Sequence, residues 1–205
     1  WFHQGKLNTC YNCVDKHVEN GKSEKVAIIY DSPITNTKKK ITYSQLLKQI
    51  SSLAASLNSL GVKKGDRVIL YMPMIPEVII SMLACARIGA IHSVVFGGFA
   101  AEELASRISD VLPKVIISAS CGLEPKRIID YKEILDKALS LTSHKPLKQI
   151  IYQREQYLCK LSSESDISWN EFVDTSSSIN CVPVDSNDPL YILHTSGTTG
   201  KPKGI

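Results

Sequence analysis

The end of the chain has the residue types and spacing of a phosphate-binding loop. Tyr191–Leu193 is a short apolar run that predicts a strand, and residues 195–204 after it contain hydroxyls, glycines and lysines, with Pro202 as the only apolar side chain. Such a segment cannot bury itself, so its backbone N–H groups are available to an anion. The glycines allow turns with positive φ and a close approach of the backbone to a ligand. The pattern therefore indicates phosphate binding, with a solvated linker as the alternative.

This loop differs from the P-loop of the nucleoside triphosphatases. The P-loop requires G-x-x-x-x-G-K-[ST], whereas Pro202 stands five positions after Gly197. The residues that we assign to the ATP phosphates are Thr195, Ser196, Gly197, Thr198, Thr199, Gly200 and Lys203. Lys203, fixed between a proline and a glycine, is the lysine expected to reach phosphate, and Lys201 is interpreted as a solvated bystander. His194 is interpreted as a strand-end residue with a local hydrogen bond rather than as a catalytic group.

Strand-like and helical runs alternate upstream of the loop. Strands are predicted at residues 26–30, 41–43, 67–72, 91–96, 115–119 and 148–152. Helices are predicted at residues 44–60, 76–88, 101–111 and 128–139, with a short one at 169–173 in the polar connecting segment 153–188. This alternation is typical of an α/β protein with doubly wound, mainly parallel sheets and flanking helices.

The composition is that of an ordinary globular protein. The chain has 205 residues, of which 43% are hydrophobic and 21% charged, enough for one domain or slightly more. The net charge is +4 with dispersed lysines, and the one cluster, Lys38–Lys40, is interpreted as part of a solvated polar turn. No basic and aromatic stripe occurs, so no nucleic-acid partner is expected. The most apolar stretch, residues 68–83, is interrupted by prolines and Glu77, so no membrane span is expected.

The cysteines suggest a second, weaker site hypothesis. Cys10 and Cys13, followed by His17, have the spacing of half a zinc site or of a redox pair. No second C-x-x-C completes a zinc set, and a redox motif is expected beside a β-α-β unit rather than near the start of a chain. We interpret these residues as structural thiols. The six cysteines form no regular framework, which favours a reducing compartment.

The loop and two further segments resemble one enzyme family. The pattern [ST]-S-G-[ST]-T-G-x-P-K-G resembles the signature of the adenylate-forming enzymes, which include acyl-CoA synthetases, luciferases and peptide-synthetase adenylation domains. Residues 92–108, H-S-V-V-F-G-G-F-A-A-E-E-L-A-S-R-I, resemble the short-chain acyl-CoA synthetases, with F-A-A-E-E-L nearer the propionyl type. The start of the chain resembles the opening segment of the acetyl- and propionyl-CoA synthetases in these residues: Trp1, Phe2, Gly5, Leu7, Asn8, Asn12, Asp15 and His17.

The resemblance implies a two-step ligation. A short-chain carboxylate, acetate or propionate, attacks the α-phosphate of ATP to give acyl-AMP and pyrophosphate, and coenzyme A then displaces AMP. Mg²⁺ is implied by ATP, although no carboxylate here can be named as its ligand, and no catalytic residue is assigned. Residues 1–205 are expected to be part of the large amino-terminal AMP-binding domain, with an opening segment at about 1–25 and the phosphate loop at 195–204. The rest of that domain and a small carboxy-terminal domain are expected to be absent, so residues 1–205 alone should be inactive.

A second site is implied for coenzyme A at Glu124-Pro125-Lys126-Arg127, expected between the strand at 115–119 and the helix at 128–139. The corresponding loop of the short-chain synthetases contacts the phosphorylated adenosine end of coenzyme A. Arg127 suits that role because its planar fork donates two hydrogen bonds to a phosphate. Lys126 stands where the family more often has glycine. The alternative is an ordinary charged turn at the start of a helix.

Two further readings remain for the whole chain. It can be a noncatalytic nucleotide- or partner-binding module of the same fold, or a zinc or thiol-redox module. The propionyl-like character favours the mitochondrial matrix, with the cytoplasm as the alternative compartment.

Overall fold

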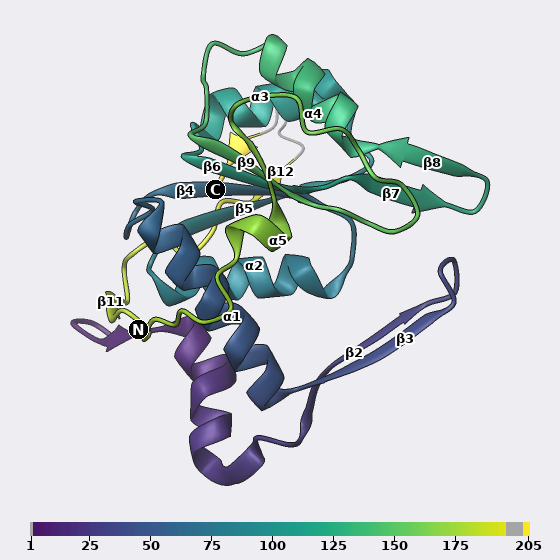
Figure 1. Ribbon diagram of the computed structural model, residues 1–205. Helices are drawn as coiled ribbons and strands as arrows, with labels where there is room; N and C mark the ends of the chain where they lie inside the picture. The colour runs from purple at the N-terminus through teal and green to yellow at the C-terminus, as the bar shows by residue number, and fades with distance from the viewer. Residues whose placement is uncertain (1, 196–202) are drawn as a thin grey trace.

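The computed structural model describes residues 2–195 and 203–205. Its centre is a five-stranded sheet in the order β10-β9-β6-β4-β5, in which every neighbouring pair is parallel (Figure 1). The strands are β4 (Arg67–Met72), β5 (Ile91–Phe96), β6 (Val115–Ala119), β9 (Lys148–Tyr152) and β10 (Asp166–Ser168). Four of them, β4, β5, β6 and β9, have the bounds predicted from the sequence.

Helices cover both faces of this sheet (Figure 1). Helices α1 (Tyr43–Ser59), α2 (Pro76–Arg87) and the short α5 (Trp169–Phe172) lie on one face, and α3 (Ala101–Val111) and α4 (Tyr131–Ser140) lie on the other. Alternate residues of β4 enter the two cores, because successive strand side chains point to opposite faces. Val68 and Leu70 face α1 and α2, whereas Ile69 and Tyr71 face α3 and α4. The predicted doubly wound α/β fold is confirmed.

Helix α1 shows how the local sequence sets its own boundaries. The Thr42 hydroxyl accepts a hydrogen bond from Gln45 N at 3.3 Å, and Gln45 Oε1 accepts one from Thr42 N at 2.9 Å. This reciprocal capping box satisfies two free N–H groups at the helix start. At the other end, Gly61 has a φ of 90°, which ends the helix as predicted.

The helix predicted at 128–139 begins later than expected. It is α4, Tyr131–Ser140, and residues before it form an antiparallel hairpin of β7 (Cys121–Glu124) and β8 (Arg127–Asp130). Asp130 is the cap of α4, since its side chain accepts a hydrogen bond from Glu133 N at 2.9 Å. Ile128 and Ile129, which precede this cap, are β-branched and favour a strand. The helical periodicity of residues 128–139 did not reveal this strand.

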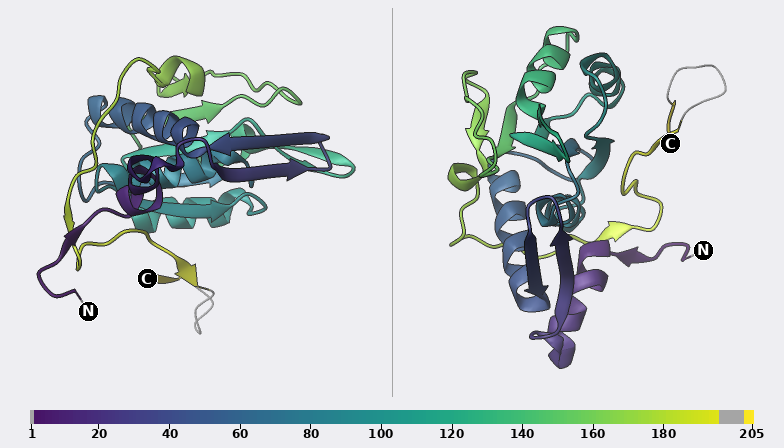
Figure 2. Two further views of the ribbon diagram at one scale, coloured as in Figure 1. Left: turned by 90° about the horizontal axis from the view of Figure 1, so that it is seen from below. Right: turned by 90° about the vertical axis from the view of Figure 1, so that its right-hand side faces the viewer.

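Two other local predictions also need correction. Lys38–Lys40 do not lie in a turn but on β3 (Thr37–Thr42), which pairs with β2 (Val26–Ser32) in an arm that projects from the body (Figures 1 and 2). The lysines are exposed there, as expected of a solvated run. The run Tyr191–Leu193 forms only an isolated parallel bridge, between Tyr191 and His92, and the strand that follows is β12 (His194–Thr195).

The start of the chain is tied to a segment near its end. Strand β1 (Lys6–Leu7) leads into two π-helical turns, η1 (Tyr11–Asp15) and η2 (Val18–Lys22), and pairs antiparallel with β11 (Val184–Asp185). Asn8 Nδ2 contacts three carbonyl oxygens, Ala86 O and Val182 O at 2.8 Å and Arg87 O at 3.2 Å. These bonds join the opening segment to the end of α2 and to the segment after residue 180. Within the described residues, no helix is long and apolar enough to cross a membrane.

Candidate functional site

The predicted phosphate loop has a two-stranded base. Strand β12 pairs antiparallel with β13 (Lys203–Gly204), so that Thr195 lies opposite Lys203 and His194 opposite Gly204. Leu193 and Ile205 extend this base with two backbone hydrogen bonds of 2.9 Å. Thr195 and Lys203 are both exposed, and they are the two predicted phosphate ligands that the structure describes. The assignments to Ser196, Gly197, Thr198, Thr199 and Gly200, and the interpretation of Lys201, lie outside the described residues.

This base is anchored to the folded core at two places. Ile192 N donates to His92 O at 2.9 Å, and Ser93 Oγ donates to Ile192 O at 3.1 Å, so the segment lies beside β5. His194 Nε2 lies 2.9 Å from Asp110 Oδ2 near the end of α3. The local hydrogen bond expected of His194 is therefore wrong, because its partner comes from another element.

The predicted coenzyme A segment is the tip of the β7–β8 hairpin. Glu124 and Arg127 are register partners, and Pro125 and Lys126 form the turn between them, with all four residues exposed. Arg127 Nε donates to Glu124 Oε2 at 2.8 Å, and Nη2 donates to Oε1 at 3.2 Å. This bidentate bond raises the pKa of Arg127 and lowers the pKa of Glu124. The tip therefore presents a positioned guanidinium to solvent.

Tyr131 connects this hairpin to the end of β5. Its ring stacks on Tyr71 with centroids 4.8 Å apart, and any side chain at Gly97 or Gly122 would overlap it. Both glycines are therefore required for close packing, Gly97 after β5 and Gly122 within β7. Burial raises the pKa of Tyr131, so the ring stays neutral and acts as a rigid spacer.

An exposed aromatic residue lies at the end of β5, next to Gly97, and it was not predicted as a site residue from the sequence. Phe96, the last residue of β5, is 70% exposed and contacts Phe99 edge to face with ring centroids 5.7 Å apart. A side chain at Gly98 would overlap the Phe96 ring, so Gly98 leaves room for it. The available signal was the aromatic residue directly before two glycines at a strand end. Such a ring can stack on a planar base.

The two predicted sites remain separate. Among residues 2–195 and 203–205, no hydrogen bond or ion pair joins the β7–β8 hairpin to the loop base. The loop base is held by β5 and α3, whereas the hairpin precedes α4 and packs on Tyr131. The residues predicted to bind ATP phosphates and coenzyme A therefore lie on two separate parts of the described structure.

Comparison with known proteins places this arrangement in a family. The family described as "AMP-binding enzyme" matches residues 14–205. The chain belongs to the AMP-binding enzyme family. The match includes the central sheet, the β7–β8 hairpin and the loop base.

Individual relatives extend the match over the whole chain. It is 55% identical to the Homo sapiens protein "Acyl-CoA synthetase short-chain family member 3, mitochondrial" over 206 residues, which cover 100% of this chain and 30% of that protein. It is 43% identical to "Acetyl-coenzyme A synthetase" of Laribacter hongkongensis, covering 100% of this chain and 31% of the relative. A solved structure of acetoacetyl-CoA synthetase from Streptomyces lividans has a TM-score of 0.85 and 25% identity, covering 98% of this chain and 30% of that one. The resemblance to short-chain acyl-CoA synthetases is confirmed, and the chain spans about a third of the length of these relatives.

Proposed function

We propose that the protein is an AMP-forming acid–thiol ligase that converts ATP, a short-chain carboxylate and coenzyme A into acyl-CoA, AMP and pyrophosphate. The observation that carries the proposal is the loop base, in which Thr195 and Lys203 stand in register, within a chain that matches the AMP-binding enzyme family. Acetate and propionate are the proposed acids, and Mg²⁺ accompanies ATP. Residues 1–205 correspond to part of the amino-terminal domain in this proposal.

In the first step the loop holds the β- and γ-phosphates. Negative charge builds on pyrophosphate as it leaves, and preorganised N–H groups and a lysine lower the barrier by stabilising that charge. The β12–β13 pairing fixes the two ends of the loop, which reduces the entropy lost when phosphate binds. Lys203 supplies the charge, and residues 195–200 supply hydroxyl and backbone donors.

Pyrophosphate release tests this assignment. The purified full-length protein is given ATP, Mg²⁺ and acetate or propionate without coenzyme A, and pyrophosphate is measured in a coupled assay. The double variant Thr198→Ala/Lys203→Ala should lower the rate at least tenfold, whereas the control Lys201→Ala should change it less than twofold. An unchanged rate in the double variant would refute the phosphate assignment.

In the second step the hairpin tip and the end of β5 bind coenzyme A. The Arg127 guanidinium is already oriented by Glu124. A phosphate group of coenzyme A displaces the Glu124 carboxylate from the guanidinium or binds the guanidinium beside it. Lys126 adds charge at the turn, and the exposed Phe96 ring offers a stacking face for the adenine. Arg127→Ala should raise the KM for coenzyme A at least fivefold and leave pyrophosphate formation in its absence unchanged. The control Lys137→Ala removes a surface lysine that pairs with Glu102, and it should change neither quantity.

The acid, the compartment and the limits of the chain are further parts of the proposal. Relatives that are named mitochondrial support a mitochondrial location, which fractionation of cells would test.

A series of carboxylates from two to six carbons should show the highest kcat/KM at acetate or propionate; an optimum at a longer acid would refute the short-chain assignment. Because the chain covers about 30% of the relatives' length, residues 1–205 by themselves should give no acyl-CoA.

A further inference from the structure

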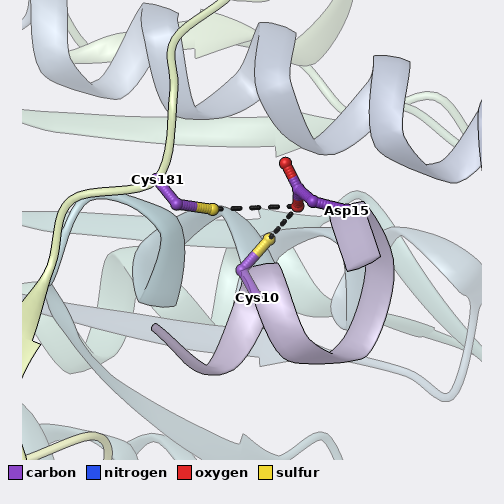
Figure 3. Close-up of side chains that lie close together, drawn as sticks. All are labelled: Cys10, Asp15 and Cys181. Carbon is purple, nitrogen blue, oxygen red and sulfur yellow. Dashed lines mark hydrogen bonds between the residues drawn. The ribbon is translucent and has the colours of Figure 1, made fainter. Parts of the chain in front are cut away.

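A cluster of two thiols, a carboxylate and a guanidinium lies outside both proposed substrate sites. Cys10 directly precedes η1, Asp15 ends that turn, and Cys181 comes from the segment between α5 and β11. Figure 3 shows both sulfur atoms directed at the Asp15 carboxylate, with Cys10 Sγ 4.0 Å and Cys181 Sγ 3.7 Å from Oδ2. One ligand atom from each of the three residues lies within 4.8 Å of the others. The fold thus brings together two thiols that are 171 positions apart in the sequence.

The guanidinium of Arg87 occupies the centre of this cluster. Its Nη1 lies 2.9 Å from Asp15 Oδ2, 3.4 Å from Cys10 Sγ and 3.1 Å from Cys181 Sγ. Nη2 and Nε are bound to Asp15 Oδ1 and to Ile179 O, at 2.9 and 2.6 Å. Two thiols and a carboxylate are a ligand set for a soft metal, but a permanent positive charge already stands where such an ion would bind. The cluster is therefore best described as a dithiol beside a fixed cation.

The two thiols differ in charge and in access. A hydrogen bond from Cys181 lowers the pKa of Cys10; burial opposes this effect, and the charge of Arg87 reinforces it. Conversely, the hydrogen bond to Cys10 and then burial raise the pKa of Cys181. Cys10 is fully buried, whereas Cys181 is partly exposed. Of the two thiols, Cys10 has the lowered pKa, and the Cys181 thiol belongs to the residue that is partly exposed.

We propose that Cys10 and Cys181 form a reversible disulfide by exchange with a small-molecule disulfide of the glutathione type. Cys181 gives up its proton to solvent and attacks one sulfur of the small disulfide, so that a mixed disulfide forms and one small thiolate leaves and takes up a proton. Cys10 then gives up its proton and attacks Cys181 Sγ, and the second small thiolate leaves and takes up a proton. The protein pair is oxidised by two electrons, and one small disulfide is reduced to two thiols.

The surrounding fold accommodates this bond. Asn8 and Val182 already join the same two segments through a hydrogen bond of 2.8 Å, and Val182 N donates to Arg87 O at 2.8 Å. A disulfide would therefore reinforce an existing junction, and its formation brings sulfurs that lie within 4.8 Å of each other to the bonded separation of about 2 Å. Since the segment after Cys181 leads to the loop base at residue 191, the bond tethers that segment to the opening of the chain.

Competing partners are less suitable. Cys13 is exposed, but it is not among the three residues whose ligand atoms lie within 4.8 Å of one another, so it lies outside the dithiol. Cys85 is fully buried, and burial raises its pKa to about 12, which makes it an internal control that should stay reduced. The two residues distinguish a specific dithiol from general oxidation.

Redox titration followed by peptide mapping tests the proposal. The purified protein is equilibrated with a series of oxidised-to-reduced glutathione ratios and quenched with acid, free thiols are trapped by alkylation in denaturant, and digests are analysed by mass spectrometry. A linked Cys10–Cys181 peptide should form, and the alkylation of both cysteines should fall together by at least tenfold while Cys85 stays alkylated. In Cys181→Ser, Cys10 should remain alkylated at every ratio, whereas the matched control Cys13→Ser should titrate like the unmodified protein.

Three outcomes would overturn the proposal. They are a Cys10–Cys13 linkage, a stable glutathione adduct on Cys181 while Cys10 remains alkylated, and the absence of the linked peptide at the most oxidising ratio. The unmodified protein supplies each readout, so misfolding of a variant does not affect the conclusion. The result is also independent of ligase activity, because no substrate is present.

Discussion

Acidification should destabilise the fold through His92. This residue lies on β5 with its side chain buried, and its ring centroid is 5.9 Å from that of Tyr191. Among the described residues, His92 Nδ1 has no hydrogen-bond partner. A proton on the ring would therefore place an uncompensated charge between β5 and the segment that leads to the loop base.

The size of the effect follows from the pKa. Burial lowers the pKa of His92 from 6.5 to about 4, so between these values the unfolded chain binds a proton that the folded protein rejects. Stability is therefore retained above about pH 6.5 and lost as the pH falls toward about 4. A pKa difference of about 2.5 corresponds to about 3 kcal/mol of unfolding free energy, at about 1.4 kcal/mol for each tenfold change.

Urea unfolding at pH 7.5 and pH 4.5 measures this contribution. The unmodified protein should lose about 2 to 3 kcal/mol more between these pH values than His92→Gln, whose side chain does not titrate. His144→Gln is the matched control for removing a histidine, because His144 Nε2 already has a partner, Pro113 O at 2.7 Å. Parallel pH dependences for the unmodified protein and His92→Gln would refute the argument that burial keeps His92 neutral.

Three further predictions concern the packing that positions the sites. Denaturant unfolding measures the stability of each variant, and coenzyme A kinetics of the full-length protein measure the KM of the Gly97 variant. Asp15→Ala should lower the free energy of unfolding by about 3 to 5 kcal/mol, because it leaves the buried guanidinium of Arg87 without its carboxylate. Asp31→Ala removes an exposed ion pair and should lower it far less. Equal losses in the two variants would contradict the argument. Gly97→Ala should destabilise the protein and raise the KM for coenzyme A, since the added methyl displaces Tyr131; unchanged values would show that this contact is not required. Ile117→Ala should lower the free energy of unfolding by about 2 to 5 kcal/mol, and Ile117→Val should lower it by about 1 kcal/mol, because the side chain is fully buried. A larger loss in the valine variant than in the alanine variant would contradict this argument.

The sequence predicted most of the sheet because its strands are short, apolar runs between clear turns. Strands β4, β5, β6 and β9 matched their predicted bounds. Prediction failed where a strand depends on a neighbour rather than on its own pattern. Residues 128–130 of β8 were predicted as the start of a helix because they precede a helical run without a break, and residues 124–127 were predicted as the loop before it. Only the cross-strand pairing of Glu124 with Arg127 identifies the hairpin.

Among the candidate site residues, too, some were predicted from the local sequence and others depend on neighbours in space. Thr195 and Lys203 were predicted from residue type and spacing, since phosphate binding requires hydroxyls, glycines and cations close together in the chain, and Arg127 was predicted from the resemblance to short-chain synthetases. Phe96 was not, because exposure of an aromatic ring at a strand end depends on what packs around it. Cys181 had no motif of its own, and its role depends on a partner at the opposite end of the chain.

By itself, the sequence determined the α/β class, the order of most elements and the resemblance to the family, because these depend on side-chain periodicity and on residues that are neighbours in the chain. The tertiary structure alone decided that His194 meets Asp110, that Tyr131 joins the hairpin to the end of β5, and that Arg87 lies between Cys10 and Cys181. The physical reason is that these contacts join segments far apart in the sequence. Their geometry is set by how the helices and strands pack against each other, and a local pattern carries no record of that packing.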